Sequence, residues 1–171
     1  MKLRSHRYRG GVIVVATIMM LTVGIALAAS PKAGNYKGTT NAPKVNGYSA
    51  PVSFKVSGSG KQLQHFQYAD GCFASGTKPK GDTYTSEFHS LGTMSVSGGK
   101  FSVKNVNTTT STKIPTGGTL KTVTTSSVKG EFTSATKATG TITFDQTEMG
   151  PGGFKHSCPS SVSRTFTATK H

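Results

Sequence analysis

Glu87, His89 and Arg164 are the residues whose types and spacing best fit a chemical site. Glu87 and His89 flank Phe88, so on a strand they share one face while Phe88 turns inward. This spacing suits two metal ligands, or a carboxylate that orients an imidazole. Two ligands do not complete a metal site, and an exposed strand face is the simpler interpretation of this pair.

Arg164 has the same parity as Phe166 and Ala168, so an unbroken strand directs it toward the apolar side. A buried guanidinium needs a carboxylate partner, and Asp145 and Glu131 end or begin neighbouring candidate strands. The functional interpretation is an arginine that binds an anion in a pocket. The simpler interpretation is a position at the rim of the domain.

The motifs of common catalytic classes are absent from the sequence, including H-E-x-x-H, G-x-S-x-G and the Walker loop. Gly58-Ser59-Gly60-Lys61 is similar to a phosphate loop, but no Ser or Thr follows the lysine, so we interpret it as a hairpin turn. We therefore predict no catalytic residue, no metal and no cofactor. Arg164, Glu87 and His89 are the candidates for ligand binding.

Residues 1–28 have the three-part pattern of a secretory signal peptide. A basic start is followed by the apolar run Gly11–Leu27, and the small residues Ala26 and Ala28 predict cleavage after Ala28. An uncleaved anchor over Gly10–Ala29 is the alternative, since 20 residues suffice to cross a bilayer. Both interpretations place a single domain, 29–171, outside the cell or at its envelope.

Cys72 and Cys158 are the two cysteines of the chain, and an even number in an exported protein indicates a disulfide. Such a long loop contributes at most about 4.5 kcal/mol through chain entropy. A redox-active pair is one alternative, although the sequence has no C-x-x-C motif. Two free thiols in a cytosolic protein are the other, which the N-terminal pattern disfavours.

The chain is strongly basic, with 20 Lys+Arg against 6 Asp+Glu, and residues 29–171 retain 16 of the basic residues. Arg164 is the one arginine among these, and the lysines are scattered singly. Proteins that read nucleic acids favour Arg, so we predict no specific nucleic-acid partner. The charge indicates a soluble, self-repelling surface, or attraction to anionic polymers of the cell envelope.

Apolar and polar residues alternate with a period of two in several short runs after residue 30. Leu, Ile, Val and Phe number 23 in residues 29–171, a low fraction that is typical of disordered chains. The repeated alternation favours half-buried strands instead. We predict an all-β fold, an antiparallel β-sandwich or small barrel of about eight to ten short strands. The Thr-rich stretch from Asn107 and the stretch from Glu148 to Pro159 are predicted to be irregular.

The chain resembles a diffuse group of secreted bacterial β-rich proteins. The matching segments are Gly34–Thr40 (G-x-Y-x-G-x-T), Val52–Val56, Cys72, Gly130–Phe132 (G-x-F), Ala138–Thr141 (A-x-G-T), Cys158 and Phe166–Ala168. The closing aromatic of the group is often Trp, and here it is Phe166. The resemblance implies a disulfide-linked β domain outside the cell and supplies no site residues.

These observations favour an exported, non-catalytic surface or binding module whose partner is an anionic envelope polymer or another exported protein. A small-ligand carrier with an internal cavity is the main alternative, and a secreted hydrolase using His89, Glu87 and Arg164 is a third. No membrane contact is expected beyond the N-terminal segment. A binding module predicts an exposed aromatic face, a carrier an enclosed cavity, and an enzyme three titratable groups in one cleft.

Overall fold

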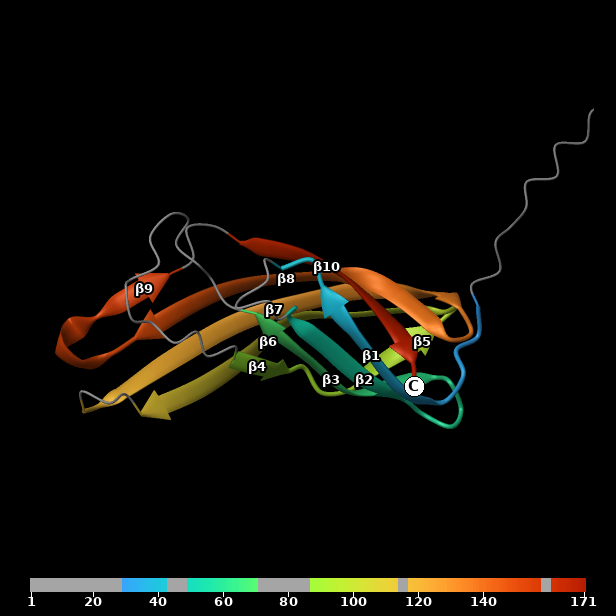
Figure 1. Ribbon diagram of the computed structural model, residues 1–171, viewed down its shortest axis with the longest axis horizontal. Coiled ribbons are helices and arrows are strands. Elements are labelled where there is room, and N and C mark those ends of the chain that lie inside the picture. The colour runs from blue at the N-terminus through green and yellow to red at the C-terminus, as the bar shows by residue number, and fades with distance from the viewer. Residues whose placement is uncertain (1–28, 43–48, 71–86, 114–116, 158–160) are drawn as a thin grey trace, which may run out of the picture.

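The computed structural model describes residues 29–42, 49–70, 87–113, 117–157 and 161–171. Within these ranges the strands form one antiparallel sheet of ten strands (Figure 1). They are β1 (Gly34–Thr40), β2 (Pro51–Val56), β3 (Gln62–Asp70), β4 (Glu87–Ser90), β5 (Met94–Ser97), β6 (Lys100–Lys113), β7 (Thr119–Ser134), β8 (Lys137–Met149), β9 (Lys155–Ser157) and β10 (Val162–Lys170).

Eight of the described strands close into a barrel. Their order is β1-β2-β3-β5-β6-β7-β8-β10, and closure follows because β10 pairs with both β8 and β1. The two remaining strands lie outside this ring, β4 on β3 and β9 on β8. The predicted all-β antiparallel fold is thus confirmed, and the barrel is the form that it takes.

Strands β6, β7 and β8 extend along most of the molecule (Figure 1). The prediction of an irregular stretch from Asn107 is wrong, because Asn107 to Lys113 all pair with β7. Threonine is β-branched and fits a strand as well as a loop. The stretch after Glu148 is also more regular than predicted, since the turn η1 (Pro151–Gly153) returns the chain so that β9 pairs with β8.

Aromatic rings fill one half of the barrel interior, which we call the aromatic half. Tyr36 and Phe54 stack with ring centroids 5.1 Å apart, and Phe54 stacks on Phe66 at 5.6 Å. Phe101, Phe132 and Phe166 surround this stack and are buried. Six large rings bury much apolar area per residue, which explains how a chain with so few large aliphatic residues forms a core.

Two glycines make room for these rings. Gly130 and Gly140 are directly paired across β7 and β8. A β-carbon on Gly130 would lie 2.5 Å from Cζ of Phe101, and one on Gly140 would lie 2.6 Å from Cε1 of Phe166. Any larger residue would displace a core ring, so the G-x-F and A-x-G-T segments have a packing role.

The predicted signal segment, 1–28, and both cysteines lie outside the described residues, so cleavage and the Cys72–Cys158 bond remain predictions. In the part of the chain that the structure describes, no helix has the length and apolar character to cross a membrane.

Candidate functional site

Beyond the stretch of β8 that pairs with β10, strands β6 to β8 continue past the closed ring, and their inner face there is polar. Buried or half-buried polar side chains from five strands lie at this face, and we call this group the polar half: Tyr68 on β3, His89 on β4, Thr108 on β6, Thr122, Thr124 and Ser126 on β7, and Gln146 and Glu148 on β8. A barrel that only needs to fold fills such positions with apolar side chains, so this composition marks the candidate site.

Strand register stacks these residues in rungs. Thr124 pairs with Thr108 on one side and Gln146 on the other, and the next rung pairs Thr122 with Glu148. Paired residues of an antiparallel ladder project to the same face. The alternation of buried and half-buried residues along β7 continues without interruption from Thr122 to Val128, so the hydroxyls lie in line with the core.

Tyr68 and His89 form the wall nearest the aromatic half. The Tyr68 hydroxyl lies 2.7 Å from Oγ of Ser126, and its ring centroid lies 4.9 Å from that of His89. Nδ1 of His89 lies 3.3 Å from Oγ1 of Thr108. Thr108 donates to the carbonyl of Thr124 at 3.4 Å, so its oxygen can accept a hydrogen bond from Nδ1 when that nitrogen carries a proton.

Thr124 is the most informative member of the polar half. Its side chain is fully buried, and its hydroxyl oxygen has no hydrogen-bond partner among the described residues. A buried hydroxyl without a partner costs about 1–3 kcal/mol relative to one that is paired. Thr124 also lies at the centre of its rung, between Thr108 and Gln146. Among the described residues, its hydroxyl therefore leaves its hydrogen-bonding capacity unused.

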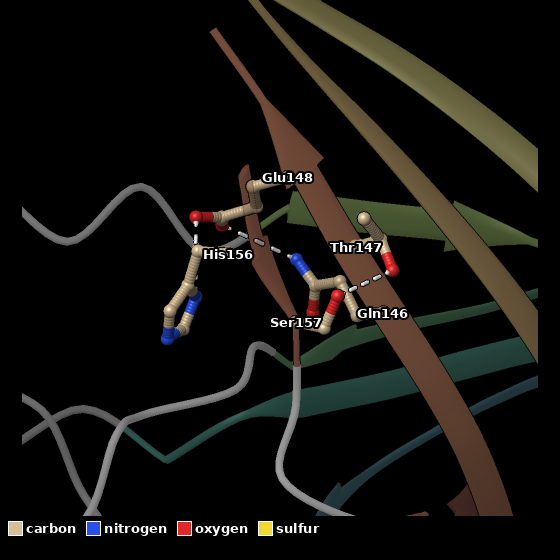
Figure 2. A network of polar contacts seen from close by, with 5 residues as sticks. All are labelled: Gln146, Thr147, Glu148, His156 and Ser157. Atoms are coloured by element: carbon tan, nitrogen blue, oxygen red, sulfur yellow. Dashed lines mark hydrogen bonds and ion pairs between the residues drawn. The ribbon is translucent and has the colours of Figure 1, made fainter. Parts of the chain in front are cut away.

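The outer end of the polar half is more open to water and contains a polar network (Figure 2). Nε2 of Gln146 donates to Oε1 of Glu148 at 3.5 Å, and Oε2 of Glu148 lies 3.8 Å from Nδ1 of His156. The side chains of His156 and Glu148 are 35% and 30% exposed. On the other face of β8, Thr147 and Ser157 hydroxyls lie 2.9 Å apart and fasten β9.

His89 is placed opposite to its predicted orientation. The sequence predicts Phe88 inside and His89 on an exposed face, whereas His89 is 1% exposed and Phe88 is 61% exposed. The reason is the pairing of β4 with β3, which sets His89 opposite the buried Tyr68. Glu87 belongs to β4, but its side chain lies outside the described residues.

Arg164 lies on the interior face of β10, as its parity predicts. It pairs with the buried Ile142 on β8 and is itself half-buried. The carboxylates predicted as its partners do not share this face: Asp145 and Glu131 are both exposed at outward positions of β8 and β7, and Asp145 accepts from Oγ of Ser161 at 2.7 Å. Both carboxylates therefore lie on the opposite face of the sheet from Arg164.

Of the polar half, only His89 is among the candidate residues that the sequence predicts. A signal for the β7 members existed, because Thr122, Thr124 and Ser126 have the parity of Val128 and Phe132. Extending that parity backward would have placed the three hydroxyls inside. An alternating pattern of threonines alone does not show which side chains face inward, because threonine suits both faces of a sheet.

A shallow depression of about 680 Å³ lies on the outer face, where β5 to β8 run side by side. Serine and threonine hydroxyls line it together with Lys100, Lys129 and Glu131. The two lysines and the glutamate have opposite charges, so the depression has no marked preference for an anionic ligand. Among the described residues, no three His, Cys, Asp or Glu side chains lie close enough to hold a metal ion.

The fold and this site define the class of protein, a small closed antiparallel β-barrel with an aromatic core and a buried polar group on the strands that extend beyond the closed ring. Comparison with family models, with curated proteins and with solved structures finds no match to this chain. Inference about its function therefore depends on its own residues.

Proposed function

We propose that this protein is an exported, non-catalytic binding module that holds a small, uncharged, polyhydroxylated molecule, of the size of a monosaccharide, in the polar half. The buried hydroxyl of Thr124, without a partner among the described residues, is the observation on which the proposal depends. Export is supported by the signal pattern of residues 1–28.

The ligand class follows from the chemistry of the residues in the polar half. Hydroxyls of Thr122 and Ser126 and the amide of Gln146 can each donate and accept, which matches a ligand with several hydroxyl groups. The rings of Tyr68 and Phe144, whose centroids lie 5.9 Å apart, are buried next to these groups and form their apolar boundary. Few convergent polar groups beside aromatic walls are typical of small-molecule sites.

The cost of burying polar groups favours a binding site over a structural role for the polar half. The aromatic half supplies the compact core, whereas each polar group buried in the polar half is stabilised only if it is hydrogen-bonded. Residues that are costly for folding and cluster at one place are typical of sites selected for function. The ligand would enter at the end where Glu148 and His156 remain partly exposed.

Titration calorimetry with a panel of neutral monosaccharides and polyols tests the proposal. We expect at least one compound to bind, and Thr124→Val and Gln146→Leu each to weaken binding by about fivefold or more. Thr40→Val is the matched control, because Thr40 is buried outside the polar half and its hydroxyl accepts from the amide of Ala42 at 3.2 Å. The proposal fails if no compound binds, or if binding survives both changes in the polar half.

A further inference from the structure

The exposed ring of Phe154 lies on the same face of the sheet as the polar half. The amide of Gly150 donates to the carbonyl of Phe154 at 2.9 Å, and this contact continues the register in which Glu148 pairs with His156 (Figure 2). Paired residues, and residues two apart on one strand, project to the same face. A β-carbon on Gly150 would lie 3.3 Å from Cδ1 of Phe154 and 3.5 Å from Cδ1 of Leu120. Both apolar side chains are therefore on the face that Glu148 and His156 share.

Phe154 lies at the open end of this face, beyond the buried residues. Its side chain is 52% exposed and Leu120 is half-buried beside it. Gln146, which is buried, and Gly150 are four positions apart along extended backbone, so their two rungs are separated by about 14 Å. One monosaccharide bound at Gln146 is too short to reach the ring of Phe154, whereas a short chain of sugars spans both.

The charges on this face favour a neutral ligand over an anionic one. Glu148 contributes a carboxylate that is 30% exposed, and the imidazole of His156 beside it is charged only when protonated. Three lysines at this end occupy the alternate positions of their strands and project from the opposite face: Lys113, Lys121 and Lys155. Arg164 pairs with Ile142, six positions before Glu148 on β8, and is therefore about 20 Å away.

We propose that Phe154 and Leu120 form a second subsite, on which the following sugars of a neutral oligosaccharide stack while its terminal sugar occupies the polar half, an extension that rests on the proposed function. An exposed aromatic ring can cover the apolar C–H face of a sugar, and the carboxylate of Glu148 accepts hydrogen bonds from sugar hydroxyls. The turn η1 fixes the ring before binding, because the amide of Phe154 donates to the carbonyl of Pro151 at 3.3 Å. The net positive charge of the whole chain favours anionic polymers, but the groups on this face do not.

The gain in affinity with the length of the sugar chain tests the second subsite. We expect a neutral trisaccharide to bind about tenfold more tightly than its constituent monosaccharide in titration calorimetry. Phe154→Ala should remove this gain and leave the monosaccharide affinity within about twofold, and Phe154→Tyr should retain the gain. Phe88→Ala is the matched control and should change neither affinity, because Phe88 is also exposed but projects from β4 away from this face.

A trisaccharide of uronic acids tests the charge of this face. It should bind about tenfold more weakly than the neutral trisaccharide, and Glu148→Gln should narrow this difference to about threefold or less. Asp145→Asn removes the same charge from the opposite face of β8 and should leave the difference unchanged. Tighter binding of the acidic trisaccharide would overturn the assignment of a neutral ligand.

Monosaccharide affinity reports on the polar half, and the gain from chain length reports on the second subsite, so the two proposals can fail separately. Monosaccharide binding without a gain, a gain that survives Phe154→Ala, or an equal loss in Phe88→Ala would overturn the second subsite alone. A dimer without sugar that Phe154→Ala dissociates in sedimentation would also overturn it, because the ring would then be a contact between copies. Binding of neither compound would overturn both proposals.

Discussion

Replacing Thr124 by Val should make the unliganded protein more stable. Valine has nearly the shape of threonine and the same preference for strands, so the change removes a hydroxyl without opening a cavity. That hydroxyl is fully buried and has no partner among the described residues. The hydrogen bond that Thr124 accepts from Thr108 uses its backbone carbonyl and is retained.

The magnitude follows from the desolvation of the hydroxyl. Leaving such a group unpaired costs about 1–3 kcal/mol, and a buried methyl group replaces it, so we expect the free energy of unfolding to rise by about 1–2 kcal/mol. For a domain of this size the thermal midpoint should rise by about 3 °C for each kcal/mol. A stabilising polar-to-apolar change that also weakens ligand binding would show that Thr124 serves the site at the expense of the fold.

Urea denaturation measures this effect, with the midpoint rising and the slope unchanged. Thr40→Val is the control and should lower the free energy of unfolding by about 1 kcal/mol, because the Thr40 hydroxyl accepts a hydrogen bond from Ala42. If Thr124→Val lowers the midpoint as Thr40→Val does, the hydroxyl has a structural partner, and the argument for a site in the polar half is refuted.

Three further predictions concern the fold. Gly140→Ala should lower the free energy of unfolding by about 1–3 kcal/mol, because its β-carbon would meet the ring of a core phenylalanine. Gly58→Ala is the control and should be nearly neutral, because open space surrounds Gly58. Equal denaturation midpoints for the two variants would contradict the packing role of Gly140. Burial raises the pKa of Tyr36 above its ordinary value of 10.0, although a backbone hydrogen bond opposes this. Its contribution to stability is therefore complete below pH 10 and is lost as the pH rises through the folded-state pKa, and Tyr36→Phe should show a shallower loss in alkaline denaturation. Reduction of the predicted Cys72–Cys158 bond should lower the unfolding midpoint without creating activity, and an unchanged midpoint would count against the bond.

The strands were predictable where apolar residues alternate with polar ones. Val52–Val56 and Ile142–Phe144 lie within β2 and β8, and the hairpin at Gly98-Gly99 joins β5 to β6. Period-two alternation requires one buried face, and turn residues between the runs require hairpins. Antiparallel pairing and an all-β fold therefore follow from local physical chemistry alone.

The direction of the polar strands was decided by tertiary structure. Threonine and serine suit either face of a sheet, so the alternation in β7 became readable only when its pairing with β6 and β8 set Thr124 between Thr108 and Gln146. The four residues of β4 permit two opposite assignments. Hydrophobicity favours Phe88 inside, but the pairing of His89 with Tyr68 puts the imidazole there instead.

Closure of the barrel was also decided by tertiary structure. Nothing in the local pattern of β10 distinguishes the edge of a sandwich from a strand that joins the two ends of one sheet. Pairing of β10 with β1 and with β8 decides this. The pairs with β1 join residues more than 100 positions apart, and those with β8 join residues 18 to 32 positions apart. Composition and periodicity determined that this chain forms strands with one solvated and one buried face. Long-range register determined which polar groups became enclosed, because a shift of one residue in the pairing of two strands exchanges these faces.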